Sequence, residues 1–159
     1  MPEQRFVHEE LGWNFRMTNL QAALGVAQLE RLDEFVSIKR RMGIRYTQLL
    51  ESTPGIQLPL AKTRNAENVY WVFGVVLDDG VPFDAREAMS RLAKAGVGTR
   101  PFFWPMHEQP VFRKKGLFES ESYPVAERIA RRGFYVPSGM ALTDGQIERV
   151  AAAVKGILA

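Results

Sequence analysis

Cysteine is absent from all 159 residues of the chain, and this absence excludes several classes of protein. Disulfide scaffolds, zinc sites built from thiolates, iron–sulfur clusters and cysteine nucleophiles all need that side chain. A chain without cysteine also fits a reducing compartment, so we expect the protein to be cytoplasmic. The length favours a single domain with a hydrophobic core that needs no covalent or metal cross-link.

Long apolar runs and histidines are also scarce. No run approaches the roughly 20 apolar residues that cross a bilayer, and the opening MPEQRFVHEELG lacks the apolar core of a signal peptide. We therefore expect neither a membrane span nor a secretion signal. The two histidines, His8 and His107, are far apart in the chain, and neither has a partner at a metal-ligand spacing. We expect no metal site.

The excess of positive charge is small, because 21 lysines and arginines against 18 acids give a net charge of +3. Basic clusters occur at residues 39–41, 113–115 and 131–132, and each has acidic neighbours. Nucleic-acid binding needs a concentrated excess of basic residues on one surface. We therefore interpret the clusters as solvated faces and expect no nucleic-acid partner.

Helix signals begin after an irregular opening. Residues 1–17 have no sustained hydrophobic period and form a predicted N-terminal arm, whereas residues 18–159 form a predicted α/β domain with its leading helix. In a capping box, two side chains three positions apart bond each other's backbone N–H. Three such pairs are predicted to open helices: Thr18 with Gln21, Asp84 with Glu87, and Thr143 with Gln146. The first opens one long helix, or two consecutive ones, ending before residue 54.

Strands and further helix limits complete the predicted fold. The helix that opens at Asp84 is expected to end at Gly96, in a left-handed backbone conformation. A later helix is expected to open at Pro124, with Val125 and Ile129 facing inward. Residues 69–77 are apolar on both alternating faces, which predicts a central strand with Trp71 in the core. Shorter strands are predicted at 97–103 and 134–136. Helices alternating with short strands predict a small two-layer α/β domain.

Hydrogen-bonding groups gather at residues 12–18, just before the first helix. Gly12 allows a tight turn, and Asn14, Arg16 and the N–H groups of the helix start suit an anion such as phosphate. Alternatively, Asn14 and Arg16 only tie the opening loop to its helix.

Aromatic planes, an arginine and a histidine gather between prolines at residues 98–107. Rigid prolines place Arg100, Phe103, Trp104 and His107 in one loop, which suits a ligand pocket. The alternative is an aromatic satellite core without a ligand. The chain has no glycine-rich phosphate loop of a common type, and neither histidine has the context of a catalytic triad. We therefore assign no catalytic residue.

Residues 12–25 (GWNFRMTNLQAALG) closely resemble the signature of the DegT/DnrJ/StrS nucleotide-sugar aminotransferases. The resemblance continues at 70–73 (YWVF), 96–103 (GVGTRPFF), 105–110 (PMHEQP) and 136–139 (VPSG), and so spans essentially the whole chain. It implies the C-terminal small domain of a fold-type I aminotransferase, which uses pyridoxal phosphate (PLP). The loop at 100–107 is most similar to perosamine synthases, which use glutamate to aminate a GDP-linked 4-keto-6-deoxy sugar.

The resemblance also implies roles for individual residues. Asn14, and as the second candidate Arg16, are implied to reach the PLP phosphate of a neighbouring subunit, which in turn implies a homo-oligomer. Amide and guanidinium groups suit anions, and aromatic faces suit a sugar or a base. Four residues are implied to wall the nucleotide-sugar pocket: Arg100, Phe103, Trp104 and His107.

Two catalytic groups of the resembled enzymes have no counterpart in this sequence. The lysine that binds PLP covalently and the aspartate that pairs with its ring nitrogen belong to a large domain that is absent here. We therefore expect the chain alone to be inactive and not to bind PLP. It is either the C-terminal region of such an enzyme or a free-standing binding or dimerisation module. An unrelated regulatory domain would leave residues 12–25 unexplained.

Overall fold

The first helix of the chain opens as the sequence predicts. The computed structural model describes residue 13 and residues 15–159, and contacts divide the chain into two units, Met1–Asp33 and Glu34–Ala159. The first unit holds α1 (Asn19–Leu29), which opens with the capping box of Thr18 and Gln21. The backbone N–H of Gln21 lies 3.3 Å from Thr18 Oγ1, and that of Thr18 lies 2.9 Å from Gln21 Oε1. No residue of α1 is buried within the described chain.

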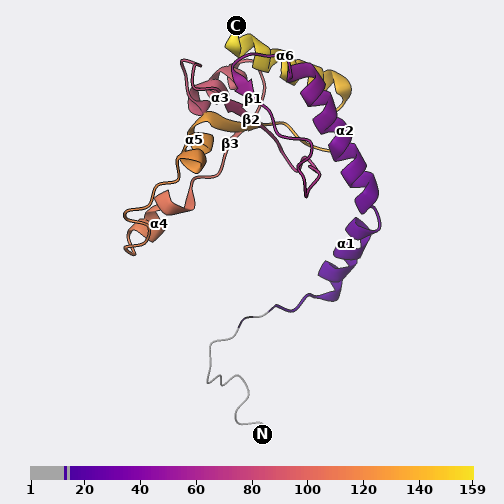
Figure 1. The fold of residues 1–159 in the computed structure, drawn as a ribbon. Coiled ribbons are helices and arrows are strands. Elements are labelled where there is room, and N and C mark those ends of the chain that lie inside the picture. The colour runs from indigo at the N-terminus through magenta and orange to yellow at the C-terminus, as the bar shows by residue number, and fades with distance from the viewer. Residues whose placement is uncertain (1–12, 14) are drawn as a thin grey trace. The chain divides into compact units, whose positions relative to one another are not determined.

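The predicted long helix consists of two consecutive helices. After α1 a short turn leads into α2 (Leu32–Leu50), and the break is visible in Figure 1. The C-cap of α1 is Glu30, whose N–H still donates to Val26 O at 2.9 Å. From Glu34 onward α2 belongs to the second unit, where it buries Met42, Tyr46 and Leu50.

An antiparallel sheet of four strands organises the second unit. The strands are β1 (Ile56–Gln57), β2 (Phe73–Leu77), β3 (Arg100–Pro101) and β4 (Gly133–Val136), and their order in space is β1-β2-β4-β3. Phe73 pairs with Val136, which fixes the register of the two central strands. Between β3 and β4 the chain leaves the sheet through η2 (Met106–Glu108) and α4 (Pro110–Arg113). It then returns through α5 (Pro124–Arg132), as Figure 1 shows.

One face of this sheet carries the hydrophobic core. Phe73, Val75 and Phe134 are fully buried on it, because the pleat directs alternate side chains to the same side. The helices that pack into this core are α2, α3 (Ala85–Lys94) and α6 (Asp144–Leu158), so the unit is the predicted two-layer α/β domain. Their buried residues include Tyr46, Leu50, Ala88, Leu92, Ile147, Val150 and Val154.

On the opposite face an aromatic ring packs directly on the sheet. Phe102 lies against Gly74 and Gly133, where an added Cβ would be 2.8 Å and 2.5 Å from the ring. The same ring stacks on Tyr135, with 4.6 Å between the ring centres. Two glycines on adjacent strands therefore create the space that this ring fills.

The predicted strand 69–77 is four residues shorter than expected, and the prediction for Trp71 is wrong. The strand begins at Phe73, and the Trp71 side chain is 67% exposed. The reason is the backbone of Tyr70, which has a left-handed φ of 51° and donates its N–H to Asn68 Oδ1 at 2.7 Å. That conformation breaks the alternation, so the Tyr70 ring enters the core against Gly43 and Trp71 faces outward.

The bounds of other strands, and the orientation of one helical residue, also differ from the prediction. The strand expected at 97–103 is reduced to Arg100–Pro101, and the short β1 was not predicted. Val125 is 72% exposed instead of inward-facing, because the partly buried side of α5 begins at Glu127.

The predicted helix ends are mostly confirmed. Gly96 follows α3 with a φ of 76°, and Thr143 opens α6 with a complete capping box. At α3 the N-cap Asp84 accepts from the N–H of Glu87, but the Glu87 carboxylate bonds Arg91 at 2.8 Å instead of returning to the cap. Within the described part of the chain, none of the helices has both the length and the apolar character that a bilayer crossing requires.

Candidate functional site

A hollow of about 1250 Å³ lies in the second unit, beside the edge strand β3. The start of α3, the end of α5 and the loop after β3 form its walls. A smaller hollow of about 520 Å³ shares Trp71, Arg100 and Tyr135 with it and extends to Ser138. The walls of the larger hollow include Trp71, Asp84, Arg86, Met89, Arg100, Phe102, Phe103, Trp104, Arg131 and Tyr135.

Aromatic rings form one wall of the larger hollow. Trp71 and Phe103 stack with 6.4 Å between their centres and 14° between their planes. Phe103 meets Tyr135 edge-on, at 6.2 Å and 65°. Such an assembly offers flat, polarisable faces to a planar or sugar-like ligand. The Tyr135 hydroxyl is protonated at neutral pH and can donate a hydrogen bond, and burial raises its pKa further above neutrality.

The backbone around Trp71 is held from α2. Lys39 Nζ donates to the carbonyl oxygen of Trp71 at 2.8 Å and also to that of Ser138. Ser138 Oγ in turn accepts from the N–H of Phe73 at 2.8 Å. Desolvation lowers the pKa of Lys39. Lys39 therefore joins α2 to the two segments that carry the aromatic wall.

Positive charge is concentrated in the other walls of the hollow. Arg86, Arg100 and Arg131 line it together with one acid, Asp84. Guanidinium groups bind phosphate and carboxylate groups through paired N–H donors. Arginines beside stacked aromatic rings suit a ligand that combines a planar ring with anionic groups.

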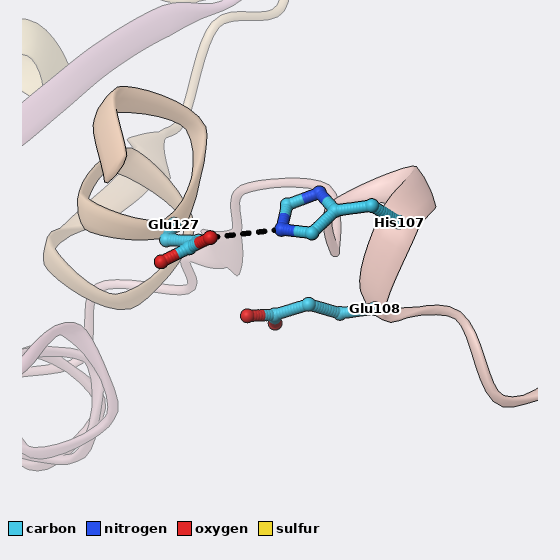
Figure 2. A group of neighbouring side chains, drawn as sticks. All are labelled: His107, Glu108 and Glu127. Carbon is cyan, nitrogen blue, oxygen red and sulfur yellow. Dashed lines mark hydrogen bonds and ion pairs between the residues drawn. The ribbon is translucent and has the colours of Figure 1, made fainter. Parts of the chain in front are cut away.

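His107 lies buried beside this hollow and is not one of its lining residues. Its side chain is 5% exposed, and Nε2 lies 2.9 Å from Glu127 Oε1. Figure 2 shows the His107 ring directed toward the Glu127 carboxylate. The same carboxylate accepts from the backbone N–H of Tyr123 at 2.8 Å and from Ser122 Oγ at 3.1 Å. The Tyr123 N–H contributes most to lowering the pKa of Glu127, and His107 adds to it. This pair ties η2 to α5.

The carboxylate of Glu108 approaches the same pair. His107, Glu108 and Glu127 offer ligand atoms within 4.8 Å of one another, which is a spacing that a metal ion could bridge. Glu108, however, already binds Arg131 Nη2 through both oxygens, at 2.8 Å and 3.0 Å. Arg131 therefore already neutralises the Glu108 carboxylate, and a metal ion would have to displace it.

The structure brings three of the predicted pocket residues together. Arg100, Phe103 and Trp104 all line the larger hollow, whereas His107 lies behind its wall. Asn14 lies outside the described residues. Arg16 is described and exposed, and it belongs to the first unit. The binding roles of all six residues stay predictions.

Sequence reasoning missed other residues of the hollow. Trp71 was placed in the core, and Tyr135 and Arg131 had no local signal, since one lies in a short apolar strand and the other in a basic helix turn. Their neighbours in space are more than 20 positions away in the sequence, as with Arg131 and Glu108. Only the folded chain brings them together.

Comparison of the sequence with known proteins assigns the chain to a family. The family model described as "DegT/DnrJ/EryC1/StrS aminotransferase family" matches residues 1–155. The GDP-perosamine synthase of Vibrio cholerae is 32% identical over 153 residues, which cover 96% of this chain and 40% of that protein. The chain thus spans about 40% of the length of this relative.

Solved structures agree with this match. S. venezuelae DesV superposes with a TM-score of 0.81 at 29% identity, covering 98% of this chain and 40% of that one. The E. coli GDP-4-keto-6-deoxy-D-mannose-3-dehydratase, solved with bound hydrated PLP, shares the fold with a TM-score of 0.77 at 18% identity, covering 96% of this chain and 39% of that one. The fold is thus that of sugar aminotransferases, and the chain belongs to the DegT/DnrJ/EryC1/StrS aminotransferase family.

Proposed function

We propose that this chain is the C-terminal region of a PLP-dependent sugar-nucleotide aminotransferase, acting in the cytoplasm as a homo-oligomer. The observation that carries the proposal is the larger hollow, which is lined by the stacked rings of Trp71 and Phe103 and by the guanidinium groups of Arg86 and Arg100. A nucleoside diphosphate sugar has the matching parts: a planar base, a sugar and a pyrophosphate. The similarity to a GDP-perosamine synthase supports a GDP-linked sugar. We propose a 4-keto-6-deoxy sugar as the acceptor and glutamate as the amino donor.

PLP supplies an electron sink for amino transfer when it is bound. In this chain Asn14 and Arg16 are the proposed ligands of its phosphate. Arg16 fits that role, because it is an exposed guanidinium two residues before Thr18, the N-cap of α1, and a helix start favours anions. Asn14 and Arg16 belong to the proposed arm at residues 1–17, and residues 18–159 form the proposed domain.

Covalent attachment of the cofactor is proposed to come from elsewhere in the full protein. Six lysines occur in the sequence, all within its described part, and none lines the larger hollow. Lys39 is held by two backbone carbonyls, and Lys62 pairs with Glu67 at 2.8 Å. We therefore assign this chain the walls of the substrate pocket and the contacts between subunits, but no proton-transfer residue.

The coding DNA upstream of Met1 tests the proposal. We expect an in-frame segment that encodes a large domain with a cofactor lysine. The full reading frame should then aminate GDP-4-keto-6-deoxymannose with glutamate and PLP, and the 159-residue chain alone should show no such activity. A stop codon directly upstream, or amino transfer by the chain alone, would contradict the proposal. The former would instead favour a non-catalytic binding or dimerisation module.

A further inference from the structure

Arg131 is in contact with three groups at once on the rim of the larger hollow. Its Nη2 donates to both carboxylate oxygens of Glu108, and its Nη1 donates to the backbone oxygen of Glu127 at 3.1 Å. The guanidinium carbon lies 5.2 Å from the centre of the Trp104 ring. Because the guanidinium is planar, hydrogen bonds along its edges fix the orientation of the face that it presents to the ring.

Trp104 depends on this contact for its position in the wall. The ring is 50% exposed, and its Nε1 donates to the backbone oxygen of Glu108 over 3.4 Å, which is a long hydrogen bond. The next residue, Pro105, is buried and holds the backbone. The backbone is therefore held by the fold, whereas the ring itself contacts Arg131 and the backbone of Glu108.

The Arg131–Glu108 pair differs from an ordinary surface ion pair. Glu108 is only 16% exposed and engages Arg131 through both oxygens, so the guanidinium has little freedom to rotate. Arg128, one turn earlier on α5, pairs instead with Asp79, whose side chain is 76% exposed. Arg128 does not line the larger hollow and offers a matched control on the same helix.

We propose that Arg131 is a positioning residue whose guanidinium plane, fixed by Glu108, holds the Trp104 ring in the wall of the larger hollow. Arg131 acts through Trp104 on any ligand that stacks there. This ligand-related part rests on the proposed function, whereas the positioning itself does not. A lysine at position 131 keeps a positive charge beside Glu108, but it lacks the planar face that stacks on the ring and the fork of N–H donors that bonds Glu108 and Glu127 together.

Acrylamide quenching of Trp104 fluorescence tests the proposal in the full chain. Trp13→Phe and Trp71→Phe leave Trp104 as the single tryptophan reporter. In this background Arg131→Lys and Arg131→Met should raise the quenching constant, to at most about twice its value, because half of the ring is already exposed. Arg128→Lys and Arg128→Met should leave it unchanged. Arg131→Lys retains a positive charge beside Glu108, so the quenching constant can still be measured in this variant even if Arg131→Met unfolds the chain.

Two results would overturn the positioning role. One is a quenching constant in Arg131→Lys equal to that of the parent. The other is an equal rise in the Arg128 variants, which would indicate general loosening of α5.

Calorimetric titration of GDP into the chain and its Arg131→Lys variant, both with Trp71 retained, separates this proposal from the proposed function. GDP binding that is weakened several-fold in Arg131→Lys supports both. A raised acrylamide constant in Arg131→Lys, with no GDP binding to either protein, supports Arg131 as a positioning residue and contradicts a nucleotide in this hollow.

Discussion

The ring of Phe102 occupies the space into which a side chain at Gly133 would extend. A Cβ at Gly133 would lie 2.5 Å from the ring and 2.5 Å from the backbone oxygen of Ile129. Gly133 has an ordinary extended backbone, with φ −102° and ψ 144°, so its role here is space rather than conformational freedom. The sheet face behind the larger hollow therefore depends on a missing side chain.

Gly133→Ala is expected to destabilise the domain by about 1–3 kcal/mol, because neither the ring nor the backbone can move without disturbing β4. Urea unfolding monitored by circular dichroism measures the change. Gly139→Ala is the matched control, since nothing lies within 4 Å of the Cβ it would add. Equal midpoints for the two variants would contradict the tight contact.

Trp71→Ala is expected to change the free energy of unfolding by less than about 1 kcal/mol, because the side chain is exposed. Phe73→Ala, two residues later and fully buried, should cost about 3–5 kcal/mol. Chemical denaturation of the two variants checks the difference. If Trp71→Ala lowered the free energy of unfolding as much as Phe73→Ala, the exposed position of Trp71 would be wrong.

Arg132 should matter more for stability than its neighbour Arg128. It donates to the backbone oxygens of Val81 at 3.0 Å and Phe83 at 2.9 Å, and also to those of Leu77 and Asp78. Arg132→Met leaves these carbonyls without their charged donor and should cost about 1.5–3 kcal/mol. Arg128→Met removes an exposed ion pair and should cost below about 1 kcal/mol. Thermal denaturation of the two variants in parallel compares them, and similar losses would refute the ranking.

Stability should fall in acid partly through Glu127. Hydrogen bonds from the Tyr123 N–H and from His107 lower the pKa of this carboxyl below its ordinary value of 4.5. Because the folded-state pKa is the lower one, its contribution is fully present above pH 4.5 and is lost as the pH falls through the folded value. Urea midpoints between pH 7 and pH 3 should therefore decline less steeply in Glu127→Gln than in the wild type. Parallel pH curves would show that Glu127 has no part in the decline.

Self-association of the chain is expected from the proposed oligomeric enzyme. None of the residues of α1 is buried, and Leu20 and Leu24 are 81% and 70% exposed. Such an apolar surface is commonly covered by a partner. Light scattering over a concentration series should give a mass above that of one chain, and Leu24→Glu should lower it. A constant mass near 18.0 kDa would contradict the expectation.

Much of the fold was predictable because its signals are local. Thr18 and Thr143 open helices through side chains only three residues away, and Gly96 ends one through its own backbone conformation. The composition and the pattern of apolar residues also gave the two-layer α/β class. The signature at residues 12–25 predicted the family that the comparisons confirm.

The candidate site depended on tertiary structure. The direction of Trp71 follows from the left-handed backbone of Tyr70, which is compensated by packing of the Tyr70 ring against Gly43 on α2. The contact between Trp104 and Arg131 involves a guanidinium that pairs with Glu108, 23 positions away. By itself the sequence determined where helices begin and which family the chain resembles, since those depend on neighbouring residues. Only the folded chain decided which aromatic rings face the core and which face the hollow, because that choice depends on contacts between distant segments.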